Sequence, residues 1–325
     1  MRARIVGTGS YVPQKVLTNK DLEALVDTTD AWITERTGIR ERRMAAPGEA
    51  TSDMCVEAAR RACALAGVRP EDVDLIIVGT ISPDLPMPSC AVLVQAKLGA
   101  KKAFAFDVSA ACAGSLYALS IAEKFLRTGQ CKLALVLGSE LLTRIVDWTD
   151  RNTCVLFGDA AGAMVLTAES GERGILSTHL HSDGTQADIL KIPGGGSANP
   201  TTAATVAARE HYVKMQGKEV YKFAVRALED VSREALAANG LAPSDVTHVI
   251  AHQANLRILE AVLKRLDIPM DRAVTNIARY GNTSSASVPM TLDEASRGGK
   301  LEEGDLILMM AIGAGMAWGS AIVRW

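Results

Sequence analysis

The chain has 325 residues, of which 48% are hydrophobic and 22% are charged, and its formal net charge is −2 at pH 7. This composition is typical of a globular protein with a sizeable core, and it argues against nucleic acid as the main partner. The N-terminal residues lack the apolar run of a signal peptide, and no apolar run is long enough to span a membrane. The six cysteines are scattered without a CxxC pair, so we expect reduced thiols in a cytoplasmic enzyme, with no disulfide framework and no metal site.

An aromatic and basic segment lies near the N-terminus, at residues 28–40. The indole of Trp32 can stack on a flat base, and the guanidinium of Arg36 can bind a phosphate through two hydrogen bonds. Taken alone, Trp32 is more simply interpreted as a half-buried helix anchor. Arg151, further along the chain, is likewise more simply interpreted as a solvated loop charge.

Two segments of the chain repeat one another. Residues 62–80 match residues 235–253 at seven positions with a constant offset of 173, and both indicate a helix end, a turn with proline and an apolar strand. The same offset places Cys112 on Ser285. A further match, between 158–166 and 315–323, has an offset of 157, so the first half carries 16 extra residues near 139–157. We predict two duplicated halves, 1–172 and 173–325.

The expected strands are continuous apolar runs rather than alternating patterns, for example at residues 75–80, 104–108 and 248–252. Such runs are typical of sheets that are buried on both faces and flanked by helices, so the fold class is α/β. Two packed units of this kind create a seam between the halves. We therefore expect a site to which both halves contribute.

Cys112 stands where the apolar run 104–108 gives way to a helical pattern, with Leu116, Leu119, Ala122 and Phe125 on one face. A cysteine at a helix N-terminus is favoured as a thiolate by the helix dipole and the free backbone N–H groups. Its alanine and glycine neighbours leave room for a substrate. The alternative is a buried cysteine in a tightly packed seam.

Two further polar residues follow buried segments. His252 comes directly after an apolar strand, where α/β sheets place their ligands, and Asn282 lies in a glycine-containing loop before a helical stretch. Each signal is weak alone, because a structural histidine and a turn asparagine are the commoner cases. The remaining histidines, His179, His181, His211 and His248, have no metal-ligand partners at convincing spacing.

The motifs DVSAACAG at Cys112, HQANLRI at His252 and YGNTSSAS at Asn282 stand together with GDAAGAMVL, WGSAIVRW and DAWITERTGIRER. With them the chain resembles the thiolase superfamily over essentially its full length. Within that superfamily it resembles β-ketoacyl-acyl carrier protein synthase III, the initiating condensing enzyme of dissociated fatty-acid synthesis. The resemblance implies a five-layer αβαβα fold from two duplicated halves, and a homodimer.

The same resemblance implies the chemistry. Cys112 takes an acyl group from acyl-CoA, and the backbone N–H groups of Cys112 and Ala314 stabilise the oxyanion. Here Gly313-Ala314-Gly315 stands where the family has three glycines. His252 Nε2 and the Asn282 amide then act as neutral donors while malonyl-acyl carrier protein loses CO2. No cofactor is implied, since acyl-CoA is a substrate.

The resemblance also assigns the coenzyme A contacts. Trp32 and Arg151 sandwich the adenine, Thr28 and Arg36 hold phosphate, and Asn255 lies near the pantetheine tunnel. These assignments reverse the simpler interpretations of Trp32 and Arg151 given above.

A basic helix face follows His252. The pattern places Arg257, Lys264 and Arg265 on the outer side of a helix, where they would attract an acidic carrier protein. A solvated helix face remains an alternative for Lys264 and Arg265. The resemblance also places Met87 at the acyl site of the partner subunit. A medium-sized, adaptable side chain there favours short straight primers and leaves longer ones open.

Three other functions compete with this interpretation. A related condensing or acyl-transfer enzyme of secondary metabolism would share the catalytic residues and differ in primer or acceptor. A cysteine hydrolase also uses cysteine, histidine and asparagine, but the duplication and the coenzyme A segment argue against it. A catalytically inactive coenzyme A-binding protein is disfavoured by the intact set of Cys112, His252 and Asn282.

The glycine-rich stretches 7–10 and 194–197 lack the rest of a nucleotide-binding motif. The segment 193–208 is expected to be a flexible surface excursion.

Overall fold

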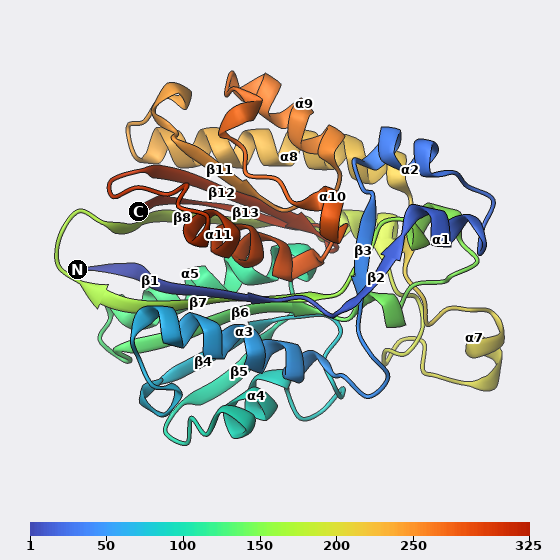
Figure 1. The fold of residues 1–325 in the computed structure, drawn as a ribbon, viewed down its shortest axis with the longest axis horizontal. Helices are drawn as coiled ribbons and strands as arrows, with labels where there is room; N and C mark the ends of the chain where they lie inside the picture. The colour runs from blue at the N-terminus through green and yellow to red at the C-terminus, as the bar shows by residue number, and fades with distance from the viewer.

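The computed structural model describes residues 1–325, which form two mixed sheets (Figure 1). The first sheet has the order β1-β7-β6-β4-β5, and the second has the order β11-β12-β13-β8. β4 is parallel to β5 and β6, and β11 is parallel to β12, whereas the other neighbours are antiparallel. The strands are β1 (Arg2–Tyr11), β4 (Leu75–Gly79), β5 (Phe104–Val108), β6 (Leu133–Glu140), β7 (Ala160–Glu169), β8 (Gly174–Ser182), β11 (His248–Ala251), β12 (Leu306–Gly313) and β13 (Ala317–Arg324).

Helices pack on both faces of each sheet. α5 (Gly114–Arg127) and α11 (Ser287–Arg297) lie between the two sheets. α3 (Thr51–Ala66) and α4 (Cys90–Leu98) cover the outer face of the first sheet, and α8 (Gly217–Ala238) and α9 (Leu256–Leu266) cover the second. The five-layer αβαβα order expected from the resemblance is therefore confirmed (Figure 1).

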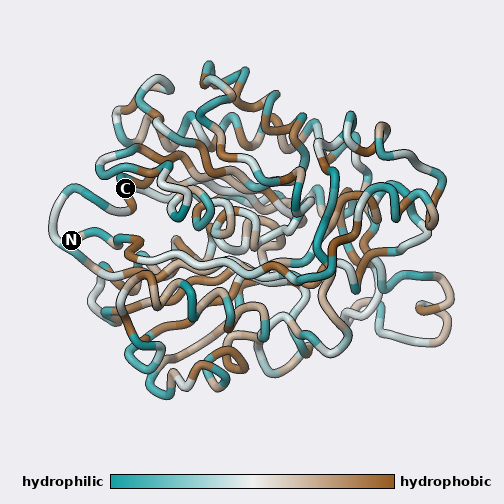
Figure 2. Tube along the Cα trace, in the orientation of Figure 1, coloured by the Kyte–Doolittle hydropathy of each residue, from teal (hydrophilic) through white to brown (hydrophobic).

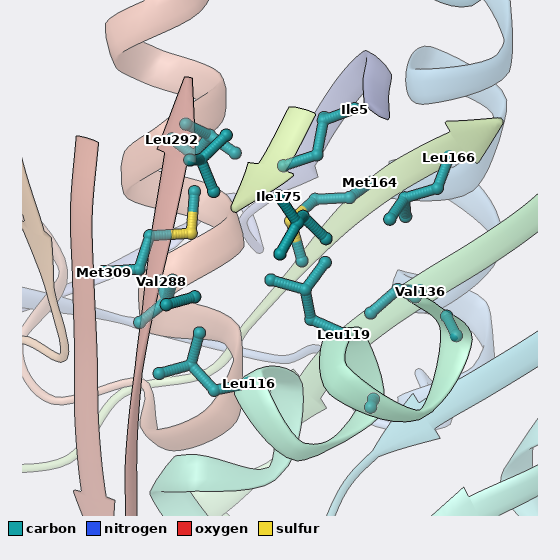
Figure 3. Packing of buried hydrophobic residues seen from close by; sticks show 14 of the residues in the cluster. Ile5, Leu116, Leu119, Val136, Met164, Leu166, Ile175, Val288, Leu292 and Met309 are labelled. Atoms are coloured by element: carbon teal, nitrogen blue, oxygen red, sulfur yellow. The ribbon is translucent and has the colours of Figure 1, made fainter. Parts of the chain in front are cut away.

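The central core joins both sheets to α5 and α11. It contains 26 buried residues, and Figure 3 shows Leu116 of α5 beside Val288 of α11, while Leu119 points toward Ile175 and Met164. Leu116, Leu119 and Ala122 are buried as the helical spacing predicts, while Phe125 is only partly buried. Each buried leucine stabilises the fold by about 1.5–3 kcal/mol. Hydrophobic segments follow the interior strands, and hydrophilic segments gather at the outer turns (Figure 2).

The repeat found in the sequence is also a repeat of structure. β4, η2 (Ala111–Ala113), α5 and β6 recur 173 residues later as β11, η7 (Ser284–Ala286), α11 and β12. Ala111 and Ser284, which the offset pairs, both adopt left-handed backbone conformations, with φ of 45° and 50°. The boundary predicted between residues 172 and 173 lies in the turn between β7 and β8.

The extra residues of the first half connect β6 to β7. There the chain forms η3 (Leu142–Arg144) and α6 (Arg151–Cys154), whereas only residues 314–316 connect β12 to β13. This insertion packs beside a small sheet of β2 (Lys15–Thr18) and β3 (Glu41–Met44), and beside α1 (Asn19–Glu23), α2 (Asp30–Thr37) and α10 (Ile277–Tyr280). It lies at the end of the molecule where the site residues converge (Figure 1).

Residues 193–208 lie at the surface, as the expected surface excursion requires, and they include a short helix. It contains α7 (Ala203–Ala207) and lies between β9 (Leu190–Lys191) and β10 (Lys214–Met215), which pair with each other. Just after this segment, Arg209 forms an ion pair with the buried Asp147 of the insertion, and this guanidinium holds the pKa of Asp147 well below its usual range.

The remaining short 3-10 turns are η1 (Pro70–Asp72), η4 (Gly184–Ile189), η5 (Pro243–Asp245) and η6 (Met270–Arg272). No helix is both long enough and apolar enough to cross a membrane.

Candidate active site

Cys112, His252 and Asn282 line one cavity of about 830 Å³. Cys112 lies in η2, His252 follows β11, and Asn282 precedes η7, so the repeated strand ends bring the three residues to one place. Their exposed fractions are only 8%, 6% and 6%. Both halves of the chain therefore contribute to a nearly buried cluster, as the seam between two packed units suggests.

Cys112 lies just before α5, at the helix N-terminus that the sequence predicts. The expectation of a resting thiolate is wrong, because burial raises the pKa of the Cys112 thiol to about 12. The nearby charge of Glu140 raises this pKa further, and a hydrogen bond from Ser284 opposes the shift. The cost of desolvating a charged sulfur thus exceeds the benefit of the helix terminus. The thiol must lose its proton before the sulfur can act as a nucleophile.

His252 is held by its own backbone, whose N–H donates to the carbonyl of Met310 at 2.8 Å. Burial lowers the pKa of His252 to about 3, so the ring is neutral at physiological pH. Its Nδ1 atom is buried and has no hydrogen-bond partner. A neutral imidazole at the cavity wall can donate one hydrogen bond to an oxygen of a substrate.

The orientation of the Asn282 amide is fixed by the protein. Its Oδ1 accepts a hydrogen bond of 2.9 Å from the backbone N–H of Ser284. The Asn282 N–H donates to the carbonyl of Leu156 at 2.8 Å, and its carbonyl accepts from the N–H of Gly158 at 3.0 Å. With Oδ1 engaged, the Nδ2 group is the one that can donate to a substrate.

The turn between β12 and β13 contacts the nucleophile. A Cβ added to Gly313 would lie 2.4 Å from the backbone nitrogen of Cys112, so only glycine permits this approach. Ala314 follows in the turn, and its N–H donates to no backbone or side-chain acceptor of the protein. Ala314 and Cys112 line the same small cavity.

That second cavity has a volume of about 200 Å³ and is almost entirely apolar. The residues around Cys112 there are Ile81, Leu142, Phe157, Leu190, Ile192 and Val213, with Lys191 at one side. Sequence reasoning did not find them, since no motif marks scattered apolar side chains. Met87 is 83% exposed and lines neither cavity of this chain. Its assignment to the acyl pocket of a partner stays a prediction.

The mouth of the large cavity carries the predicted coenzyme A residues. The guanidinium carbons of Arg36 and Arg151 each lie 4.9 Å from the centre of the Trp32 ring. Trp32 and Arg36 line the cavity, whereas Arg151 and Thr28 do not. The Thr28 hydroxyl is buried without a hydrogen-bond partner. Because Arg151 already rests on the indole, an adenine between Arg151 and Trp32 requires Arg151 to move.

Asn255 lines the same cavity and joins two helices. Its Oδ1 caps α9 by accepting from the N–H of Arg257, and its Nδ2 donates to the carbonyl of Arg36 at 3.1 Å. Asn255 therefore has a structural role in addition to its predicted place by the pantetheine.

The predicted basic face divides into two parts. Arg257 is exposed at the cavity mouth, whereas Lys264 and Arg265 lie outside the cavity lining. Arg265 is paired with Glu229 of α8 at 2.9 Å, which lowers the charge it offers to a partner. Lys218 and Lys222 of α8 also line the cavity, and no sequence motif indicated them. Four basic residues of the cavity lining, Arg36, Arg257, Lys218 and Lys222, thus form a cationic rim.

No group of three or more histidine, cysteine, aspartate or glutamate side chains could hold a metal ion.

Comparison with known proteins agrees with this geometry. The family profile described as 3-oxoacyl-[acyl-carrier-protein (ACP)] synthase III matches residues 106–184, and the profile of its C-terminal part matches residues 236–325. A protein of Xanthomonas campestris pv. campestris named β-ketoacyl-[acyl-carrier-protein] synthase III is 54% identical over 99% of this chain and 98% of its own length. A protein of the same name from Caldanaerobacter subterraneus is 50% identical over the same shares.

Solved structures give the same result. The crystal structure of 3-oxoacyl-[acyl-carrier-protein] synthase III from Aquifex aeolicus covers 99% of this chain and 100% of its own, with a TM-score of 0.92 and 46% identity. A priming β-ketosynthase of a polyketide biosynthetic pathway also has a TM-score of 0.92, over 99% of this chain and 96% of its own, but is 37% identical.

Proposed function

The chain belongs to the 3-oxoacyl-[acyl-carrier-protein] synthase III family, and we propose that it condenses an acyl-CoA primer with malonyl-acyl carrier protein through an acyl-Cys112 intermediate. It is a condensing acyltransferase that initiates fatty-acid synthesis. The observation that carries the residue assignment is the convergence of Cys112, His252 and Asn282 on one cavity whose mouth is lined by Trp32 and Arg36.

In the first half-reaction, the sulfur of Cys112 attacks the thioester carbonyl of acyl-CoA. The N–H groups of Cys112 and Ala314 donate to the oxyanion, and the acyl chain enters the apolar cavity beside the sulfur. The thiol of coenzyme A then leaves past Trp32 and Arg36. Its nucleotide is bound by Trp32, Arg36, Arg151 and Thr28 at the mouth.

In the second half-reaction, the malonyl thioester loses CO2 and becomes an enolate. The neutral ring of His252 and the Nδ2 group of Asn282 donate to the thioester oxygen as negative charge develops there. Neither residue has to remove a proton, since breaking the carbon–carbon bond supplies the electron pair. The enolate carbon attacks the acyl group, and Cys112 is released as β-ketoacyl-acyl carrier protein leaves.

The enzyme is proposed to act as a cytoplasmic homodimer that needs no cofactor. β5 is the edge strand of its sheet, and Phe104 on it is 42% exposed and packs against Phe125. Leu85 and Met87 are exposed on the loop after β4, which supports an interface that includes this edge. The six cysteines are free, as in a reducing compartment.

The test is a complete reaction with acetyl-CoA and malonyl-acyl carrier protein, followed by mass spectrometry of the carrier protein. We expect acetoacetyl-carrier protein from the native chain and none from Cys112→Ser. If the native chain gives product only when the primer is already attached to carrier protein, the assignment of acyl-CoA as primer is wrong. In that case, a related enzyme with another primer or acceptor is the better interpretation.

A further inference from the structure

A buried carboxyl group lies directly behind the nucleophile. Glu140 ends β6, is fully buried, and forms no ion pair with a lysine, arginine or histidine. Its two oxygens instead accept hydrogen bonds of 2.5–3.3 Å from neutral groups of both halves, namely Thr80, Ile81, Ser82, Ser284 and Ser285. These hydrogen bonds favour the charged carboxylate, but burial outweighs them and raises the pKa of Glu140 to about 7.

The other titratable groups nearby are occupied or uncharged. Asp159, next to the register partner of Glu140, bonds to Thr143 and Ala45. Asp84 of the loop after β4 bonds to Ser52, and His252 across the cavity is neutral. This leaves Cys112 as the ionisable group whose charge is opposed by a charge on Glu140.

Ser284 connects the two groups. Its hydroxyl lies 3.1 Å from Glu140 Oε1, and Ser284 lines the same small cavity as Cys112 and lowers the pKa of that thiol. Ser284 has a left-handed backbone conformation, as does its counterpart Ala111 just before Cys112. A hydroxyl has one hydrogen, so it cannot donate to an ionised Glu140 and to an ionised Cys112 together.

We propose that Glu140 is a positioning residue that shares one negative charge with Cys112 through the Ser284 hydroxyl, so that the sulfur ionises when the carboxyl group is protonated. In one state, Cys112 is a thiol and Ser284 donates to the Glu140 carboxylate. In the other, protonated Glu140 donates to Ser284 Oγ, and Ser284 donates to the Cys112 thiolate. This inference rests on the proposed role of Cys112 as the acylated residue.

The exchange balances without another reactant. The Cys112 proton moves to Ser284 Oγ while the hydroxyl proton of Ser284 moves to Glu140 Oε1, so one S–H and one O–H bond break and two O–H bonds form. The net charge of the group stays at minus one. Glu140 keeps the proton while Cys112 carries an acyl group, and returns it when condensation releases the Cys112 thiolate.

The experiment is the rate of Cys112 alkylation by iodoacetamide between about pH 6 and pH 9, read by peptide mass spectrometry on the full chain. In the native protein, the rate should rise with pH and level off above about pH 7, where Glu140 ionises and opposes the thiolate. In Glu140→Gln, the uncharged amide removes that opposition. The rate should then keep rising about tenfold per pH unit and exceed the native rate by about tenfold at pH 8.

Two serine variants separate the connection from general packing. Ser284→Ala removes the donor to the thiolate and should slow alkylation by about tenfold at every pH, since a hydrogen bond to a charged group is lost. Ser285→Ala is the matched control, because Ser285 lies 3.2 Å from the same Glu140 oxygen. Its hydroxyl is also 2.7 Å from the carbonyl of Gly79, an acceptor that Ser284 does not share. This control should leave the alkylation rate nearly native below about pH 7 and move the levelling-off only to somewhat higher pH, because the Ser285 hydroxyl also lowers the pKa of Glu140.

The proposal is overturned if the native rate rises through pH 7 without levelling off, or if Glu140→Gln has the native profile. It is also overturned if Ser285→Ala slows alkylation as much as Ser284→Ala. Should Glu140→Gln fail to fold, the native profile and the two serine variants still decide. Acylation of native Cys112 by acyl-CoA is measured separately by intact mass. If Cys112 is acylated, only the proton exchange between Cys112 and Glu140 has failed. If it is not acylated, the proposed function has failed.

Discussion

The backbone N–H of Ser284 donates to Oδ1 of Asn282 at 2.9 Å, and this contact decides which end of the amide faces the substrate. Exchanging the two ends of the amide would place two donors against each other, so the Nδ2 group is left to donate into the cavity. Ser284, which orients Asn282 through its backbone, is the neighbour of Ser285, the residue that the repeat pairs with Cys112. One turn thus orients the asparagine and also reaches the nucleophile.

Asn282→Asp tests this assignment. The carboxylate still accepts from Ser284, but it has no hydrogen to donate to the enolate oxygen. We expect condensation to fall by at least about a hundredfold, as for the loss of one oxyanion donor. Acylation of Cys112 by acetyl-CoA should persist, and intact mass separates the two steps. A variant that condenses within about tenfold of the native rate would show that Asn282 is not a donor in the transition state.

The depressed pKa of His252 predicts a pH dependence of stability. As the pH falls below 6.5, the ring in the unfolded chain binds a proton, whereas the folded ring stays neutral down to about pH 3. The unfolded state then binds more protons, so stability is lost on acidification by about 1.4 kcal/mol per pH unit from this group. His252→Gln should reduce the slope of the unfolding free energy between about pH 6 and 4. Urea unfolding at several pH values measures it, and equal slopes would contradict a neutral buried ring.

Trp32 should affect substrates that carry a nucleotide and no others. Trp32→Ala removes the surface on which the adenine stacks, and we expect the KM for acetyl-CoA to rise about tenfold with a smaller change in kcat. The matched measurement uses the acetyl thioester of N-acetylcysteamine, which has no nucleotide. The KM for this thioester should not change. An equal rise for both thioesters would mean that Trp32 supports the cavity rather than the nucleotide.

Gly313 should be intolerant of any side chain. In Gly313→Ala, the new Cβ would meet the backbone nitrogen of Cys112 at 2.4 Å and push the nucleophile out of place. Displacement on this scale should slow Cys112 acylation by about a hundredfold, measured by rapid mixing and intact mass. Gly184→Ala is the control, since no atom lies within 4 Å of its Cβ position. Native acylation by Gly313→Ala would contradict the close contact between the turn and the nucleophile.

The two arginines of α9 should differ toward the carrier protein. Arg257 is exposed at the cavity mouth, whereas Arg265 is paired with Glu229. Arg257→Glu should raise the KM for malonyl-acyl carrier protein about tenfold at low salt and less at high salt, because the attraction is screened. Arg265→Glu should have a smaller effect. If Arg265→Glu has the larger effect, the carrier protein binds farther along α9 than proposed.

The repeat was predictable because turns and helix ends require particular residues, chiefly glycine and proline. Gly67 and Gly240 end equivalent helices in the left-handed conformation, and Pro70 and Pro243 begin equivalent turns. The offset of 173 can therefore be recognised from the sequence alone. The positions of Cys112 and His252 at strand and helix ends followed from the same patterns. These are local features, and local features are what a sequence shows most directly.

What the sequence missed depends on distant parts of the chain. The pKa of Cys112 is set by the depth of its burial and by Glu140, which no local pattern relates to it. The apolar cavity beside Cys112 includes Val213, which lies beyond a segment expected to be flexible. Arg151 stacks on Trp32 although 119 residues of chain separate them. Such contacts arise only when distant parts of the chain pack together.

The central claim is that Cys112 carries the acyl group, and intact mass measures this directly. The protein is incubated separately with acetyl-, isobutyryl- and octanoyl-CoA, with Cys112→Ser as the control. We predict a gain of one acyl group that depends on Cys112, and the small apolar cavity predicts the fastest reaction with a short primer. No adduct from any of the three thioesters, or an adduct that persists in Cys112→Ser, would contradict the account.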